Sequence, residues 1–202
     1  MPSIEHQRTE IVPGAYHHSW VRKDDNGNVT DRFDGWPTKP NGEVDGNPLS
    51  GYGKSLTVKN NNPVDGTADI VDTYTGSDKD IDTRWQSGQS AADQINASPP
   101  SYQGDSRINL DTHEPERATN SNSAAYTLGK SMGFSQDDTE PDNSPGWGRD
   151  LLPNYTPPTP ITPVPLSSTG PDDGGASLTD QDATELTSDF ASRNAALMDD
   201  DA

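Results

Sequence analysis

A serine and a histidine form the clearest pair of side chains that could do chemistry. Ser121 follows Asn120 at the predicted start of a helix, where the helix dipole is positive and backbone N–H groups are free. An anionic nucleophile would be stabilised there. A serine hydroxyl is weakly acidic and needs a general base. His18, which lies in a predicted strand, is the candidate base, so the pair points to acyl transfer.

Four further side chains are candidates for the supporting roles, and the choice among them stays open. Asp31 and Asp34 lie on the strand predicted to pair with that of His18, and either one could orient the imidazole. Asn120 or Asn122 could donate to an oxyanion. Helix capping explains both asparagines equally well, because their side-chain oxygens accept from free backbone N–H groups.

The two central residues also have ordinary structural explanations. Ser121 could be a plain N-cap residue, and His18 could be a strand histidine packed beside Trp20. His17 should point to the other face of its strand, which makes it the poorer base. The hypothesis of a catalytic site therefore depends on Ser121 and His18 coming together in the fold.

The helix that would carry Ser121 has both ends marked in the sequence. Residues 120–123 are all good N-cap types. Ala125, Leu128 and Met132 recur on one apolar stripe, and Gly133 is typical of the left-handed residue that closes a helix. We therefore predict a helix over residues 120–133.

A β-hairpin should carry the histidine. Residues 15–23 alternate in the manner of a strand, and 24–28 contain the Asn-Gly pair that favours a tight turn. Residues 29–36 return as the second strand. Three side chains share one face of the first strand: Tyr16, His18 and Trp20.

The remaining predicted elements are short. Segments 55–58, 68–74 and 107–110 are strand candidates, and 90–96 is a helix candidate. The acids of 78–82 alternate as in a calcium loop but lack its glycine and distal glutamate, which favours a solvated acidic turn over a calcium site.

Two short motifs resemble a known family. His18-Ser19-Trp20-Val21 followed by Asn120-Ser121-Asn122-Ser123 resembles the circularly permuted papain-like (NlpC/P60-type) enzymes. It is most similar to a bacterial group of these domains that lacks the catalytic cysteine. The resemblance covers roughly residues 12 to 134. It implies an α+β fold, in which a small antiparallel sheet packs on a central helix, and it places Ser121 where the family has its cysteine nucleophile.

The resemblance also implies a class of activity. We expect a hydrolase or acyltransferase acting on an amide or ester bond, such as a toxin or secreted effector domain. Because serine replaces cysteine, activity itself is in question. The alternative is a non-catalytic binding or structural domain on the same scaffold. The substrate is not implied.

Several kinds of chemistry are excluded or unsupported by the sequence. The chain has no cysteine, which excludes disulfides, thiolate metal sites and a cysteine nucleophile. His6 and His113 are isolated and show no metal-ligand spacing. No phosphate loop, dinucleotide fingerprint or Gly-x-Ser-x-Gly elbow occurs. We therefore expect neither a metal nor a cofactor.

The composition limits the size of the folded core. Only 27% of the 202 residues are apolar, with 18 glycines and 18 prolines, so part of the chain should lack a core. We expect a domain over 1–134, an acidic Pro/Gly-rich linker over 135–177 and an amphipathic C-terminal segment over 178–202. Because of its composition, we expect the chain beyond about residue 135 to be flexible, dispensable for folding and available to a protein partner.

The charge restricts the partners. The formal net charge is -19, from 33 acidic and 14 basic residues, which repels nucleic acid and anionic lipid. Two interpretations of the acid excess stay open, namely disorder and adaptation to high salt, which screens self-repulsion. No apolar run could span a membrane, and no signal peptide is seen. We therefore expect a cytoplasmic protein or one exported by a signal-free route.

Overall fold

The computed structural model describes residues 1–12, 15–45, 54–61, 67–103, 107–108, 115–116, 118–135, 144, 146–159, 161–165 and 167–168. The chain divides into two compact units, Met1–Gly170 and Pro171–Ala202, and every described residue lies in the first. The first unit thus extends to Gly170, beyond the domain boundary expected near residue 135. The predicted segment 178–202 lies outside the described residues.

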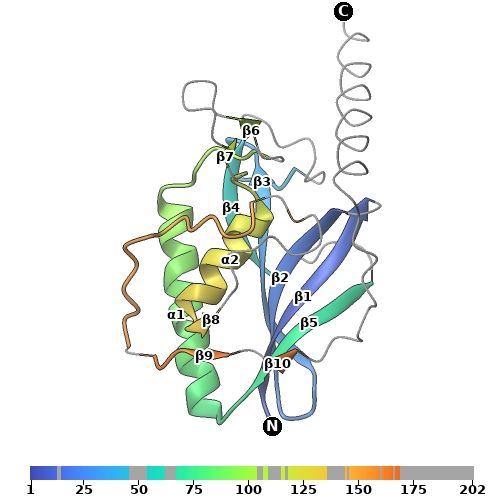
Figure 1. The fold of residues 1–202 in the computed structure, drawn as a ribbon, viewed down its shortest axis with the longest axis vertical. Helices are drawn as coiled ribbons and strands as arrows, with labels where there is room; N and C mark the ends of the chain where they lie inside the picture. Colours follow the sequence, from blue (N-terminus) through green and yellow to red (C-terminus); the bar gives the residue numbers. More distant parts are fainter. Residues whose placement is uncertain are drawn as a thin grey trace, which may run out of the picture. The chain divides into compact units, whose positions relative to one another are not determined.

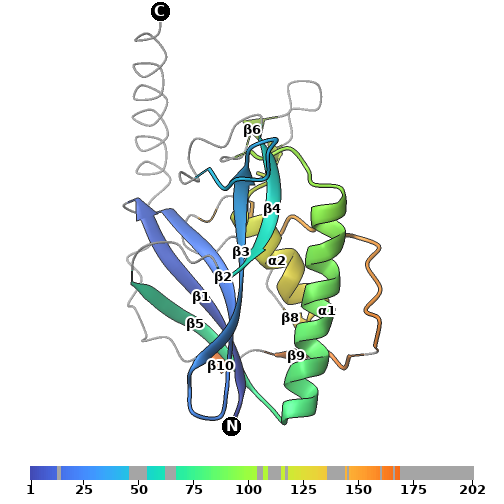
Figure 2. The same ribbon diagram turned by 180° about the vertical axis from the view of Figure 1, so that it is seen from behind.

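A six-stranded antiparallel sheet, two helices and two short two-stranded pairs make up the described fold, so the α+β arrangement is confirmed (Figure 1). The six-stranded sheet has the order β10-β5-β1-β2-β3-β4. Its strands are β1 (Ser3–Val12), β2 (Ala15–Lys23), β3 (Val29–Thr38), β4 (Ser55–Asn60), β5 (Ala68–Thr75) and β10 (Ser167–Ser168). The helices α1 (Asp78–Ala97) and α2 (Ser121–Ser131) lie on the same side of this sheet (Figure 2).

The predicted hairpin is present as β2 and β3. Its turn is closed by Asp24, whose Oδ1 accepts from the backbone N–H groups of Asn26 at 2.9 Å and Asn28 at 2.8 Å. Gly27 has φ of +82°, a conformation that costs glycine little. The strand register places Trp20 opposite Phe33, so the hairpin presents an aromatic face to the helices.

The first strand differs most from the prediction. Ile4, Ile11 and Val12 predict only a short entry strand in a polar, weakly patterned segment, but β1 is ten residues long and pairs with both β2 and β5. The alternation expected of a strand is absent from its sequence, because polar side chains, those of Glu5, Gln7 and Thr9, are buried on the face opposite the helices. The β4 and β5 strands form as predicted but are not neighbours, since β5 pairs with β1.

The first helix contains the predicted helix 90–96 but begins twelve residues earlier, at Asp78. Residues 78–82, predicted as an acidic turn, form the first turn of the twenty-residue α1, capped by Ser77. The Asp80 carboxylate accepts from Tyr74 Oη at 2.5 Å and pairs with Arg84 Nε at 3.2 Å. The acids with calcium-loop spacing therefore belong to a helix and are used in side-chain pairs there.

The second helix confirms the predicted segment. Its N-cap is Asn120, whose Oδ1 accepts from the N–H groups of Asn122 at 2.9 Å and Ser123 at 3.3 Å. The Ser123 Oγ in turn accepts from the Asn120 N–H at 2.8 Å, which completes a capping box. At the other end, Gly133 follows with φ of +80°.

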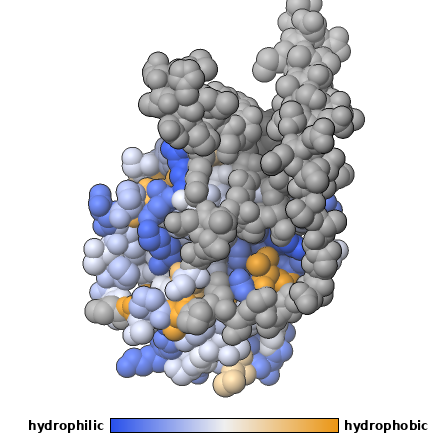
Figure 3. Space-filling view, viewed as in Figure 1, coloured by the Kyte–Doolittle hydropathy of each residue, from blue (hydrophilic) through white to orange (hydrophobic). Residues whose placement is uncertain are grey.

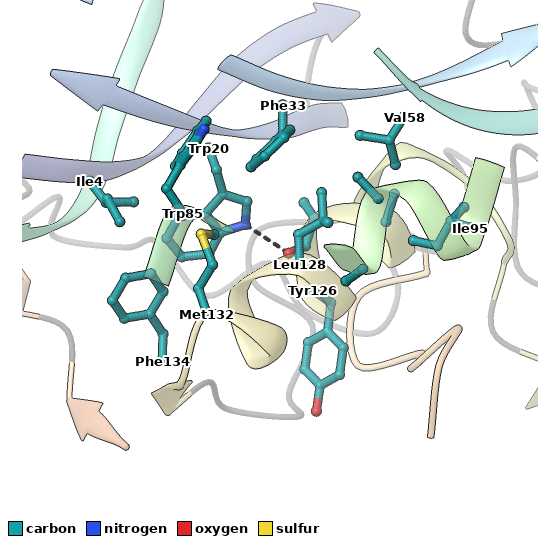
Figure 4. Packing of buried hydrophobic residues seen from close by; sticks show 14 of the residues in the cluster. Ile4, Trp20, Phe33, Val58, Trp85, Ile95, Tyr126, Leu128, Met132 and Phe134 are labelled. Atoms are coloured by element: carbon teal, nitrogen blue, oxygen red, sulfur yellow. Dashed lines mark hydrogen bonds between the residues drawn. The ribbon is translucent and has the colours of Figure 1, made fainter. Parts of the chain in front are cut away.

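The hydrophobic core lies between the sheet and the helices (Figure 4). Phe33 stacks on Trp85 of α1, with ring centroids 4.1 Å apart. Trp20 Nε1 donates to the carbonyl oxygen of Ala125 in α2 at 2.7 Å, which is the dashed line in Figure 4. This bond satisfies a buried indole N–H and holds α2 against β2.

The chain after α2 packs onto the same core. Phe134, in β8 (Phe134–Ser135), pairs in parallel with β9 (Val164–Pro165). The buried Arg84 donates to the carbonyl oxygens of Met132 at 2.9 Å and Thr162 at 3.0 Å. Arg84 thus holds the chain at Thr162 against α1, within the stretch expected to be a linker.

Two short strands, β6 (Arg107–Ile108) and β7 (Pro115–Glu116), pair with each other. The rest of the predicted strand 107–110 lies outside the described residues. On the face seen in Figure 3, the described surface is mostly hydrophilic, with small separate hydrophobic patches. Within the described residues, no helix combines the length and apolar character needed to cross a membrane.

Candidate functional site

The start of α2 fits into a split between β2 and β3. The two strands pair as far as Ser19 and Asp34. Beyond that point the side-chain amide of Asn122, and not β3, bonds to the backbone of β2. Its Oδ1 accepts from the His18 N–H at 3.2 Å, and its Nδ2 donates to the Tyr16 carbonyl oxygen at 3.0 Å. Asn122 thus supplies β2 with the hydrogen bonds of a neighbouring strand.

Ser121 lies directly over β3. A Cβ built on Gly35 would be 2.8 Å from the Ser121 Cα, so only glycine permits this approach. The Tyr102 hydroxyl bonds to both the side chain and the backbone of Ser121, while burial raises the pKa of Tyr102 to about 12. Ser121 Oγ also lies 3.5 Å from Asn122 Oδ1. Ser121 is therefore buried, and its hydroxyl contacts Tyr102 and Asn122.

The His18 imidazole contacts a different serine. Its Nε2 lies 2.7 Å from Ser144 Oγ, and its Nδ1 lies 2.8 Å from Nε2 of His6. All three side chains are buried, with Ser144 0% exposed. Because both ring nitrogens of His18 are engaged, pairing with Ser121 would require one of these bonds to be exchanged.

His6 lies in an aromatic stack. Its ring is stacked on Trp20 at 4.7 Å and on Trp147 at 5.0 Å, with interplanar angles of 18° and 17°. Burial, and to a smaller extent the charge of Arg8, lowers the pKa of His6 to about 3. His6 is therefore a neutral imidazole at physiological pH.

His18 is neutral for the same main reason. Burial lowers its pKa well below the ordinary value, with further lowering by His6, His17 and Arg8. Two neutral imidazoles can order their protons in two ways along the row. In one of them Ser144 donates to His18 Nε2, and His18 Nδ1–H donates to His6. That order leaves His18 positioned to accept the serine proton.

The candidate orienting acids do not contact His18. Asp34 lies on the other face of the sheet, where its Oδ1 is 3.1 Å from His17 Nε2 and its Oδ2 is 3.1 Å from Arg32 Nε. Asp31 pairs with Arg22 at 3.8 Å. The proposal that either acid reaches His18 is therefore wrong, and the contact at His18 Nδ1 is made by His6.

The second histidine follows the expected geometry. His17 points away from the face of His18, as the alternation of β2 predicts, and it is buried beside Trp36 with ring centroids 5.6 Å apart. Arg32, which holds Asp34, also donates to Gln7 at 3.1 Å and Ser19 at 3.0 Å. The His17–Asp34 pair thus belongs to a buried polar network on the face opposite the helices.

The two candidate oxyanion donors have structural bonds. The Asn120 amide oxygen caps the first turn of α2, and the Asn122 amide is bonded to β2 through both of its polar atoms. The capping explanation, weighed for both residues on sequence grounds, therefore accounts for Asn120. Asn122 has a role that sequence patterns did not suggest, which is to hold the strand of His18.

Three residues of this site were not singled out from the sequence: His6, Ser144 and Trp147. His6 lay in a strand whose polar composition concealed it. The segment Ser144-Pro145-Gly146-Trp147-Gly148 carried one usable signal, a tryptophan between two glycines in a stretch poor in apolar residues. Its contact with β1 and β2 is a long-range feature that no local pattern reveals.

No protein-family model matches this chain, and searches of curated proteins and of solved structures likewise gave no match. Across the part of the chain that the structure describes, no three His, Asp or Glu side chains are grouped to hold a metal ion. The functional argument accordingly depends on the geometry around His18.

Proposed function

We propose that this protein is a hydrolase or acyltransferase that acts on an amide or ester bond, with Ser144 as nucleophile and His18 as general base. The observation that carries the proposal is the row of two hydrogen bonds, Ser144 Oγ to His18 Nε2 at 2.7 Å and His18 Nδ1 to His6 Nε2 at 2.8 Å. A nucleophile, a base and a group that orients the base are the parts that nucleophilic acyl transfer needs.

The chemistry follows from the proton order along the row. Ser144 Oγ attacks the substrate carbonyl carbon while His18 Nε2 takes the hydroxyl proton, and His6 Nε2 accepts from His18 Nδ1–H. Collapse of the tetrahedral intermediate breaks the bond to the leaving group, which takes the proton from His18. Water, or another acceptor, then attacks the acyl-serine ester while His18 Nε2 takes its proton, and collapse of the second tetrahedral intermediate passes that proton to the departing Ser144 oxygen.

The group that orients His18 is the neutral imidazole of His6, and this affects the basicity of His18. A carboxylate would stabilise the imidazolium that forms on His18, whereas neutral His6 adds no opposite charge, and burial lowers the pKa of His18. His18 is thus in its basic form down to acidic pH but is a weak base. We expect slow turnover that persists well below neutral pH.

A permuted papain-like scaffold accounts for the arrangement of the parts. In that scaffold a helix starts against the strand that carries the catalytic histidine, as α2 starts against β2 here. The family position for the nucleophile corresponds to Ser121, which makes Ser121 the second candidate. Its hydroxyl contacts Tyr102 and Asn122, so that mechanism requires the His18 ring to exchange Ser144 for Ser121.

A non-catalytic binding or structural domain is the alternative function. The observation that favours it is burial, since Ser144 is 0% and His18 1% exposed. The same hydrogen bonds would then serve only to satisfy polar groups inside the domain. Catalysis requires that substrate gain access to Ser144.

Substrate panels distinguish these functions. The wild-type protein, Ser144→Ala, Ser121→Ala and His18→Gln should be assayed on amide and ester substrates across acidic and neutral pH. We expect hydrolysis by wild type and Ser121→Ala, with at least about a hundredfold loss in the other two. Loss confined to Ser121→Ala and His18→Gln would transfer the nucleophile to Ser121. Four equal rates near background would support the binding-domain function.

A further inference from the structure

We propose that the slot filled by the Trp147 indole is a binding site for a planar aromatic group of the substrate, occupied in cis by the protein's own side chain. This inference rests on the proposed function, because it describes the acyl-transfer site in its closed form. It is carried by the ring geometry around Trp147 and by the backbone that holds this side chain.

Three rings form the slot. Trp147 is stacked on His6 at 5.0 Å, is tilted at 50° against His18 at 4.9 Å and meets the edge of Tyr126 at 5.7 Å and 78°. These are the separations and angles at which aromatic rings attract one another. A flat ring satisfies all three contacts at once, whereas a branched aliphatic group has no face to stack on His6.

The slot is polar enough to orient a ligand without carrying charge in its walls. His6 and His18 are both neutral, since burial lowers the pKa of each. The charge of Arg8 acts on both histidines, and Arg8 pairs with Asp69 at 3.7 Å. The walls therefore favour a neutral aromatic or heteroaromatic ring over an aliphatic or anionic group.

The segment that bears the indole, here called the plug, is a turn with a glycine on either side of Trp147. Gly146 and Gly148, on either side of Trp147, have φ of +91° and +75°. Two backbone bonds close the segment on itself, from Trp147 N–H to the Ser144 carbonyl oxygen at 3.0 Å and from Arg149 N–H to the Gly146 carbonyl oxygen at 3.2 Å. Both bonds join backbone atoms, so the turn itself does not require the indole to stay in the slot.

The closed position depends on glycine. A Cβ on Gly146 would lie 2.6 Å from Asn120 Oδ1 and 2.7 Å from the Ala118 carbonyl oxygen, so the plug fits closely beside the N-cap of α2. The same segment begins with Ser144, whose hydroxyl is bonded to His18. A ring that enters the slot therefore lies beside the reacting hydroxyl, which places it next to the scissile bond.

Indole itself is the probe for this site. In Trp147→Ala, diethyl pyrocarbonate should modify His6 and His18 at least about tenfold faster than in wild type, as expected when stacked aromatic contacts are lost. Peptide mapping by mass spectrometry separates these histidines from the others. Indole should restore slow modification, and cyclohexanol should not. Trp36→Ala is the matched control, because its indole lies beside His17 on the other face, and there His6 and His18 should stay protected.

Two results would overturn the proposal: unchanged protection of His18 in folded Trp147→Ala, or equal protection by cyclohexanol and indole. If Trp147→Ala does not fold, Trp147→Leu keeps apolar volume without a flat ring and should show the same response to indole. These readouts need no turnover. Failure of the hydrolase proposal with protection by indole intact would leave an aromatic-binding site without catalysis.

Discussion

His18 Nε2 lies 2.7 Å from Ser144 Oγ, although 126 positions separate the two residues in the chain. The contact joins β2 to the segment after α2, and it occurs where Asn122 holds the backbone of His18. The histidine found by sequence reasoning is thus next to a hydroxyl group, but the serine that supplies it is not the one at the helix start.

Stability should fall as the pH drops below the ordinary histidine range. In the unfolded chain His6 titrates near about 6.5, and in the folded protein burial lowers its pKa to about 3. Between these values the unfolded state binds more protons, so acid favours unfolding by up to about 1.4 kcal/mol per pH unit for this histidine. Urea titrations at a series of pH values measure the slope.

The variant His6→Phe isolates this contribution. It keeps a flat ring between Trp20 and Trp147 and has no titratable group. Its free energy of unfolding should depend less steeply on pH than that of wild type between about 6.5 and 3. Parallel curves for the two proteins would mean that His6 does not carry the acid sensitivity.

Two asparagines have side-chain amides that bond to strand backbones, and variants of the two should separate an effect on stability from an effect on function. Asn96 bonds to both the N–H and the carbonyl oxygen of Val58 in β4, at 2.8 Å and 2.9 Å, as Asn122 bonds to β2. We expect Asn96→Ala and Asn122→Ala each to lower the free energy of unfolding by about 1–3 kcal/mol, because buried backbone groups lose partners. Denaturant melts compare them.

Only Asn122→Ala should also reduce the reactivity of the site, since Asn122 holds the backbone at His18 and Asn96 lies on β4, at one edge of the sheet. Equal loss of hydrolysis in both variants, once corrected for unfolded protein, would show that Asn122 has no positioning role beyond general stability.

Local signals predicted part of this fold well. The capping box of α2 and the Asn-Gly turn of the hairpin depend on residues within a few positions of each other, so the sequence displays them. Only residues 90–96 of the long α1 were predicted, because small and polar residues lie on the core side of its earlier turns, including Ser87 and Gly88. The Cβ position of Gly88 is 2.9 Å from the Met132 Cγ, which explains why a larger apolar residue is absent there.

The site was harder to predict than the fold. The strand pattern predicted that His18 faces the helix side and His17 the other side, and both placements hold. The partners of each imidazole depend on register and on segments far along the chain. His6 lies opposite Trp20 because of strand pairing. Ser144 lies beside His18 because of tertiary packing, which the amino-acid composition does not predict.

Truncation should show where the folded unit ends. A chain of residues 1–170 should melt near the full-length temperature, because the described contacts lie within it. A chain of residues 1–134 loses β9 and the buried Trp147, and removal of one such tryptophan costs about 3–5 kcal/mol. Calorimetry on both chains measures this. Unchanged melting of the shorter chain would support the boundary near residue 135.

The net charge of -19 should make stability depend on salt. Like charges on the folded surface repel each other, and at about 1 M salt the Debye length shrinks to about 3 Å. If the acidic surface is an adaptation to brine, the melting temperature should rise steadily from dilute buffer to molar chloride. A flat response would favour ordinary acidic disorder in part of the chain as the source of the excess.

The most direct measurement is the site of covalent capture by a serine-reactive fluorophosphonate probe, mapped by mass spectrometry on the intact protein and on the variants Ser144→Ala, Ser121→Ala and His18→Gln. The account predicts an adduct on Ser144 in wild type and in Ser121→Ala, and none in the other two variants. An adduct on Ser121, or none in wild type under conditions that open the Trp147 slot, would contradict it.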